Sequence, residues 1–274
     1  MKNFAFDAWD RGRLTINAEF TRLFQQHQLT TCESIWEFSQ RAIPAKALRS
    51  DRVTLRFSLA DEHGAERMFY IKRHGRSSWK EYVKPWLQGQ KPLLGARPEW
   101  EALLAFHAQD LPTMIPVARG LMSGRSFLIT EGLEGCDKLS AILTDEHRSE
   151  SERRRIILHV ADIARQMHTS GLHHQDFYLG HFLQERTEEP ARAPKLYVID
   201  LGRVRPHGPY FFRRWIVKDL AELNYSAKTA RAAERLRFLR RYFDRPLSVT
   251  DRPFIRRILQ KTSRIARHSA KNSL

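Results

Sequence analysis

The segments HTSGLHHQDFYLGHFLQ (168–184) and LYVIDLGRVR (196–205) decide the fold of this 274-residue chain. The first holds a polar loop around Asp176, which leads into the short apolar run HFLQ. The second reads as a buried strand that ends in a turn at Asp200. Two carboxylates that are separated by a short β-ribbon can converge in space. The sequence therefore predicts that Asp176 and Asp200 lie close together.

Converging carboxylates of this kind suit the transfer of a phosphoryl group. One of them, Asp176, would orient a substrate hydroxyl, and Asp200 would bind Mg²⁺, which prefers hard oxygen ligands. Each aspartate also has an ordinary explanation, because aspartate is common in turns. The reaction further needs a cation for the phosphates, and the sequence offers Lys72.

Lys72 lies near the end of a predicted strand, and Glu99 lies early in a predicted helix at 98–109. A helical wheel places Glu99 beside Leu103 and Phe106, on the side of the helix that is buried. A buried carboxylate needs a cation close to it. The sequence therefore predicts an ion pair between Glu99 and Lys72.

The order of the predicted elements gives the fold class. Strands are expected at 52–60, 66–74, 115–119 and 125–131, and helices at 34–40, 98–109, 150–170 and from about 212 onward. Strands with one helix thus precede a mainly helical part, which predicts an α+β protein with two lobes, 1–131 and 132–274. The repeated βα alternation of a doubly wound sheet is absent, and so is a Walker-type glycine loop.

Composition narrows the function classes. The net charge is +16, and residues 201–274 hold 19 Lys and Arg against 5 Asp and Glu. Such a patch indicates either an anionic partner (nucleic acid, lipid headgroups or a phosphorylated glycan) or simply a soluble basic surface. Two distant cysteines, Cys32 and Cys136, fit a reducing cytoplasm. No apolar stretch is long enough to span a membrane, and the N-terminal residues do not resemble a signal peptide.

These motifs together resemble one known family. Lys72, Glu99, His174-Gln175-Asp176 and Asp200-Leu201-Gly202 follow the plan of a protein kinase. More closely, the chain resembles the lipopolysaccharide kinase (Kdo/WaaP-type) family, and its heptose-kinase branch in particular. Four stretches carry the resemblance: LGARPEW (94–100), HTSGLHHQDFYLGHFLQ (168–184), LYVIDLGRVR (196–205) and RRWIVKDLAELNYSA (213–227).

The resemblance implies a protein-kinase-like two-lobed fold and an ATP-dependent kinase that uses Mg²⁺ to phosphorylate a sugar hydroxyl of the lipopolysaccharide inner core, with heptose as the expected sugar. Lys72 would hold the α- and β-phosphates, with Glu99 as its anchor. Asp176 would act on the acceptor hydroxyl and Asp200 would bind the metal.

Further positions are also carried over from the family. The segment ITEGL (129–133) would meet the adenine, which makes Thr130, Glu131 and Gly132 candidates for contacts with the base. His174 and Asp219 would support the catalytic loop.

The sequence departs from the protein-kinase pattern at two places that bear on catalysis. The loop expected to cover the phosphates, Leu48–Val53, contains no glycine, so that Arg49 or Arg52 would have to substitute for backbone amides. His181 stands where a second metal ligand is expected, and imidazole is a poor ligand for Mg²⁺. His181 therefore either completes the metal site or contacts phosphate.

The expected partners are the lipopolysaccharide core acceptor and an anionic inner-membrane surface, while nucleic acid is not expected because no nucleic-acid-binding signature accompanies the charge. The enzyme would be cytoplasmic, with peripheral contact at the inner face of the inner membrane. Arginines interleaved with apolar residues at 236–267 favour either an interfacial helix or ordinary helices packed on the core. Trp79–Lys91 is a second candidate for membrane contact.

Other functions are compatible with the same residues. A kinase of the same fold would use identical catalytic groups on another acceptor, such as Kdo, a small molecule or a protein. A catalytically silent scaffold, or a binder of nucleic acid through the basic half, is the alternative from a different class.

Overall fold

The computed structural model describes residues 3–49, 52–75, 95–145, 148–186, 195–206 and 212–271. The chain forms two compact units. The first comprises Met1–Asp110 and Met114–Glu134, and the second comprises Leu111–Thr113 and Gly135–Leu274. The predicted contact segment Trp79–Lys91 and the centre of the predicted phosphate loop lie outside the described residues.

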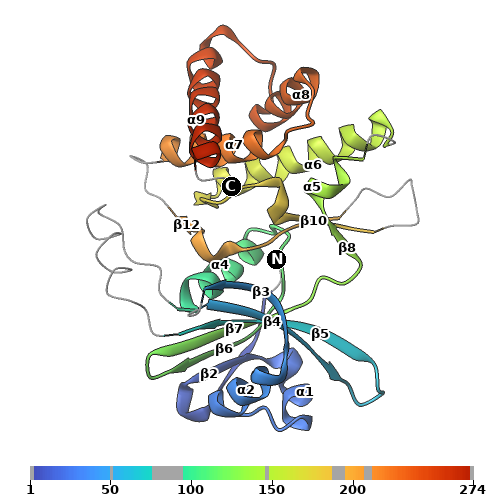
Figure 1. The fold of residues 1–274 in the computed structure, drawn as a ribbon, viewed down its shortest axis with the longest axis vertical. Helices are drawn as coiled ribbons and strands as arrows, with labels where there is room; N and C mark the ends of the chain where they lie inside the picture. Colours follow the sequence, from blue (N-terminus) through green and yellow to red (C-terminus); the bar gives the residue numbers. More distant parts are fainter. Residues whose placement is uncertain are drawn as a thin grey trace. The chain divides into compact units, whose positions relative to one another are not determined.

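The first unit is built on an antiparallel sheet of seven strands (Figure 1). Its strand order is β1-β2-β6-β7-β5-β4-β3. The strands are β1 (Phe6–Trp9), β2 (Leu14–Asn17), β3 (Ile43–Arg49), β4 (Arg52–Ala60), β5 (Glu66–His74), β6 (Pro116–Met122) and β7 (Arg125–Glu131). The helices are α1 (Thr21–Gln26), α2 (Cys32–Phe38) and α4 (Arg97–Ala108).

Alternation along β5 decides which side chains face each side of this sheet. Phe69 and Ile71 are fully buried in the apolar core that α1 and α2 share with the sheet. Because successive side chains of a strand point to opposite faces, Tyr70 and Lys72 lie on the other face, which α4 covers (Figure 1). The sheet therefore delivers Lys72 toward the helix that carries Glu99.

The helix α4 begins with Pro98 in its first turn, where the missing N–H of proline costs no hydrogen bond. Its buried side chains include Glu99, Leu103 and Phe106, which is the stripe that the helical wheel predicted. The helix runs one residue earlier at each end than the predicted range 98–109.

The second unit is mainly helical, in agreement with the predicted α+β class. Its helices are α5 (Leu139–Ile142), α6 (Glu150–Thr169), α7 (Phe212–Ser226), α8 (Ala232–Phe243) and α9 (Arg252–Lys271). Among its described residues the unit also has the short strands β8 (Cys136–Lys138), β9 (Leu172–His173), β10 (Phe182–Glu185), β11 (Leu196–Val198) and β12 (Arg205–Pro206). No helix within the described ranges is long and apolar enough to cross a membrane.

Candidate active site

Two strand pairings bring the predicted catalytic loop and the turn at Asp200 together. β10 pairs with β11, so that Phe182 lies opposite Val198. β9 pairs with β12, so that His173 lies opposite Arg205. The loop 174–181 and the turn 199–204 are thus each held at both ends, and the N–H of Ile199 donates to the carbonyl of His181 at 2.9 Å.

Asp176, His181 and Asp200 converge, as the β-ribbon predicted for the two aspartates. One possible ligand atom from each of the three side chains lies within 4.8 Å of the others. The distance from Nε2 of His181 to Oδ2 of Asp200 is 3.8 Å. Arg203 brings its guanidinium to 3.5 Å from Oδ1 of Asp176, a contact that the sequence analysis did not anticipate.

The backbone at Asp200 has a left-handed conformation, with φ of 62° and ψ of 54°. This conformation costs an ordinary L-residue about 1–2 kcal/mol, whereas aspartate and asparagine tolerate it better. A local strain of this kind persists only where the surroundings impose it, and it is common at functional sites.

The hydrogen bond at Nδ1 of His181 defines what its other ring nitrogen can do. Nδ1 lies 2.7 Å from the backbone carbonyl of Asp176, which can only accept a hydrogen bond. In the neutral ring the proton is therefore on Nδ1, and Nε2 presents a lone pair. That lone pair lies near a carboxylate oxygen of Asp200, an arrangement that a cation between the two atoms would relieve.

The three side chains fit a divalent cation. Carboxylate oxygens suit Mg²⁺, and imidazole nitrogen suits first-row transition ions better than Mg²⁺. In its neutral form His181 can complete a metal site through Nε2, and in its protonated form it can donate a hydrogen bond from Nε2 to phosphate.

His174 lies beneath this cluster and is fully buried. Its Nε2 lies 3.2 Å from the carbonyl of Ile199, and its ring stacks on that of His181 at a centroid distance of 5.9 Å. Burial lowers the pKa of His174 to about 4, so the ring is neutral at physiological pH. His174 thus joins the loop to the turn without adding charge beside the cluster.

Asp219, on α7, holds the start of the catalytic loop. Its two carboxylate oxygens accept hydrogen bonds from the backbone N–H groups of His174 and Gln175, both at 2.8 Å. Burial by itself would raise the pKa of Asp219, but the hydrogen bonds, with that from His168 foremost, lower it below its usual value. Asp219 is fully buried and contacts the loop through the backbone N–H groups of the loop.

Three further residues of α7 hold the same loop, and the sequence analysis missed them. Glu222 accepts from the N–H of Phe177 at 3.0 Å, and Ser226 accepts from the N–H of Leu179 at 2.9 Å. Lys218 donates to the carbonyl of Gln175 and to Glu222. The available signal was the spacing of these polar residues, which recur with Asp219 every three or four positions on a helix that is otherwise apolar on that side.

In the first unit, the predicted ion pair is present. Nζ of Lys72 lies 2.6 Å from Oε1 of Glu99. The Glu99 side chain is 5% exposed and that of Lys72 is 26% exposed, so the carboxylate is buried and the lysine is partly buried. The buried carboxylate thus anchors the lysine ammonium, as the sequence predicted.

The segment 129–133 is predicted to contact the adenine. Two of its backbone N–H groups already donate hydrogen bonds within the first unit. The N–H of Glu131 donates to the carbonyl of Ile115 at 3.0 Å, and the N–H of Gly132 donates to the carbonyl of Met68 at 2.8 Å. A Cβ on Gly132 would lie 3.0 Å from the Met68 side chain, which explains the glycine. Base contacts at Glu131 and Gly132 are therefore limited to their carbonyl groups.

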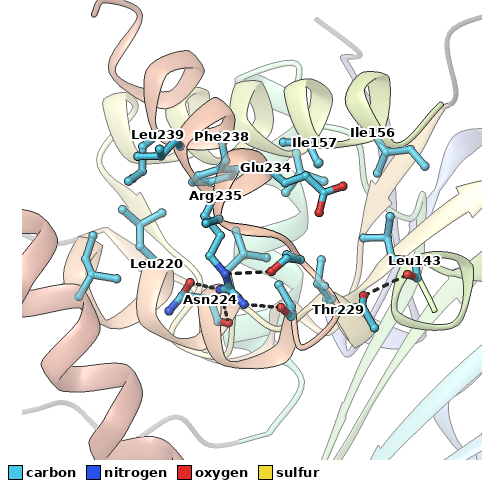
Figure 2. Close-up of a pocket in the computed structure, with 18 of the residues that line it drawn as sticks. Leu143, Ile156, Ile157, Leu220, Asn224, Thr229, Glu234, Arg235, Phe238 and Leu239 are labelled. Carbon is cyan, nitrogen blue, oxygen red and sulfur yellow. Dashed lines mark hydrogen bonds between the residues drawn. The ribbon is translucent and has the colours of Figure 1, made fainter. Parts of the chain in front are cut away.

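A separate apolar cavity of about 370 Å³ lies among the helices of the second unit. Figure 2 shows Ile156, Leu220, Phe238 and Leu239 among the side chains that surround it. The charged groups in its lining are already paired: Arg153 with Glu234 at 2.8 Å, and Arg235 with the carbonyl of Ala227 at 2.7 Å. Apart from Asn224 and Thr229, the remaining lining is apolar, which suits an apolar ligand.

The sequence matches one family model over residues 38–242, that of the lipopolysaccharide kinase (Kdo/WaaP) family. The lipopolysaccharide core heptose(I) kinase WaaP of Pseudomonas aeruginosa is 37% identical over 193 residues, which are 66% of this chain and 71% of the relative. The enzyme of the same name from Escherichia coli K12 is 33% identical over 213 residues, which are 72% of this chain and 76% of the relative.

A solved structure described as WaaP in complex with acyl carrier protein is similar in fold. It superposes with a TM-score of 0.70 at 29% sequence identity and covers 92% of this chain and 98% of the solved chain. The match confirms the predicted protein-kinase-like fold.

Proposed function

Because the chain belongs to the lipopolysaccharide kinase (Kdo/WaaP) family, and is thus an ATP-dependent kinase of a lipopolysaccharide core sugar, we propose that its acceptor is heptose(I). The observation that carries this proposal is the convergence of Asp176, His181 and Asp200 within 4.8 Å in a loop held by buried hydrogen bonds. The names of the relatives supply the sugar, and the geometry supplies the groups that phosphoryl transfer requires.

The roles follow from the chemistry of each side chain. Asp176 accepts or orients the proton of the heptose hydroxyl, which makes the oxygen a better nucleophile. Lys72, anchored by Glu99, holds the α- and β-phosphates of ATP. Asp200 and His181 bind the metal. Mg²⁺, when bound, neutralises the negative charge that the phosphates carry through the reaction.

The N–H groups of Glu131 and Gly132 already donate to backbone carbonyls, so they are not available to hydrogen-bond the adenine. In this proposal the carbonyl of Glu131 accepts a hydrogen bond from the adenine amino group. The N–H of Leu133 donates a hydrogen bond to a ring nitrogen of the adenine. The Thr130 side chain is buried and instead shapes the floor of this segment.

The proposed location is the cytoplasmic face of the inner membrane, where a core sugar attached to its lipid would be accessible. Cys32 and Cys136 are both free thiols, as a reducing compartment permits.

The proposed acceptor can be tested with two truncated lipopolysaccharides. We expect phosphate from γ-labelled ATP to enter a lipopolysaccharide that ends after heptose(I), and not one that ends at Kdo. The reason is that the acceptor hydroxyl must meet Asp176, and only the first molecule carries the heptose. Equal labelling of both molecules would assign the enzyme to Kdo, and labelling of neither would point to another acceptor.

A partner is also proposed. The similar solved chain is in complex with acyl carrier protein, and we propose that this chain binds one too. The observation that favours this is the apolar cavity between α6, α7, α8 and α9. An acyl carrier protein brings an apolar chain, and the cavity offers a mainly apolar lining (Figure 2).

Filling the cavity should remove the preference for the acylated partner. We expect wild-type protein to bind acylated carrier protein at least about tenfold more tightly than the unacylated form, and Leu239→Trp to bind the two forms equally. Leu121→Trp, which enlarges an exposed leucine of the first unit, is the matched control. Calorimetric titration measures all three. A wild-type protein that does not distinguish the two forms would rule out the cavity as the acyl site.

A further inference from the structure

The helix α9 has an unusual charge pattern. Its 20 residues include no aspartate or glutamate. They include seven basic residues: Arg252, Arg256, Arg257, Lys261, Arg264, Arg267 and Lys271. At 100° per residue these seven occupy roughly half of the helix circumference. α9 therefore presents one continuous basic face, about 30 Å long for 20 residues.

The opposite side of α9 packs inward. Ile258 is buried, and Phe254, Ile255 and Ile265 are partly buried. The apolar side thus faces the interior of the second unit, where Ile255 and Ile258 also line the apolar cavity. The basic side remains outside, with six of its seven residues exposed and Lys261 partly exposed.

On the preceding helix, α8, two of the arginines form ion pairs. Arg241 pairs with Asp162 at 2.6 Å, and Arg237 reaches Glu150 at 3.7 Å. On α9, by contrast, none of the seven basic residues forms an ion pair with another residue of the described ranges. The positive charge of α9 is therefore not neutralised locally, and like charges at this spacing destabilise an isolated helix.

We propose that the basic face of α9 is the surface through which the protein contacts an anionic lipid bilayer. This inference rests on the proposed function, since an acceptor attached to a lipid brings the enzyme to a membrane. A bilayer is flat over the length of α9 and carries negative charge throughout, which matches a basic face along one side of a straight helix. The contact is electrostatic, because the apolar side of the helix is occupied by the fold.

A protein partner matches this face less well. The core of a protein interface contains apolar and aromatic side chains surrounded by a polar rim. Near its centre the basic face has Pro253 as its one apolar side chain and no aromatic side chain, and the exposed Leu259 lies at its margin. Charge without an apolar centre fits a charged surface better than it fits a protein.

The test uses vesicles without acceptor or nucleotide. The full-length protein is sedimented with vesicles of phosphatidylethanolamine and phosphatidylglycerol, and with phosphatidylcholine vesicles for comparison. We expect binding to the anionic vesicles only, and weakening as salt shortens the range of the charges. In the variant Arg256→Glu/Arg257→Glu/Arg264→Glu, binding should be weaker by about a hundredfold or more.

A matched variant controls for net charge. Arg41, Arg56 and Arg154 are exposed and lie outside α9, and reversing all three to glutamate changes the net charge by the same amount. This control should bind anionic vesicles nearly as well as the wild type. Equal losses in both variants would overturn the proposal, because bulk charge would then explain the binding.

Two more outcomes separate the alternatives. If the α9 variant keeps vesicle binding but loses acyl carrier protein, the face is a protein surface and the proposal is wrong. If α9 acts at the membrane, the α9 variant should still phosphorylate a deacylated, water-soluble core acceptor. The variant Asp176→Asn should instead bind vesicles normally and phosphorylate no acceptor. Failure of the membrane contact is thereby distinguished from failure of the proposed function.

Discussion

Replacing Asp176 with asparagine should lower the rate of phosphate transfer by about 10²–10⁴-fold. Asparagine keeps the shape of the side chain but cannot accept the proton of the acceptor hydroxyl. The loop itself should remain in place, because its backbone is held by Asp219, Glu222 and Ser226 rather than by Asp176. The measurement is kcat with saturating ATP and a lipopolysaccharide that ends after heptose(I).

Asp137→Asn is the matched control for this change. Asp137 lies in the same unit, is partly exposed and pairs with Arg186 at 2.6 Å. It should alter neither kcat nor KM. An Asp176→Asn enzyme with normal kcat would show that a different group acts on the hydroxyl, and normal thermal unfolding of that variant would exclude misfolding as the cause of any loss.

Replacing Asp200 with asparagine should reduce transfer by about 10²–10³-fold. The carboxylate is the hard oxygen ligand of the proposed metal site, and an amide oxygen without charge binds a divalent cation more weakly. Asparagine tolerates the left-handed backbone at this position, so the free energy of unfolding should stay near that of the wild type. Binding of Mn²⁺ with an ATP analogue, followed by electron paramagnetic resonance, reports the metal site without requiring turnover.

Asp200→Ala separates strain from metal binding. Alanine loses the ligand and also pays about 1–2 kcal/mol in the left-handed conformation. It should therefore be as inactive as Asp200→Asn and less stable. If Asp200→Asn bound Mn²⁺ as tightly as the wild type, the metal assignment would be wrong.

The parts of the site that the sequence could predict are those fixed by periodicity and connectivity. The wheel of α4 placed Glu99 on the buried side, and a buried carboxylate implied Lys72. The two apolar runs around the loop implied a ribbon, and the ribbon implied that Asp176 and Asp200 converge. In both cases one local pattern and one rule about charge or pairing were sufficient.

The features that could not be predicted from the sequence depend on contacts between distant segments of the chain. The strands β1 and β2 have four residues each, too few to show a period, and β2 is fixed in part by a hydrogen bond from Asn17 to the carbonyl of Pro116 at 3.0 Å. The support from Lys218, Glu222 and Ser226 required knowledge of which helix lies under the loop. The left-handed backbone at Asp200 has no signature in a strand that otherwise reads as apolar.

The claim that this chain is a heptose kinase driven by Asp176 is tested most directly by labelled transfer from ATP to a lipopolysaccharide that ends after heptose(I). Wild-type protein and Asp176→Asn are assayed side by side, and mass spectrometry locates the phosphate. We expect phosphate on heptose(I) with the wild type and a loss of at least about 10²-fold with the variant. Transfer to that sugar at equal rates by both proteins, or no transfer by either, would contradict the claim.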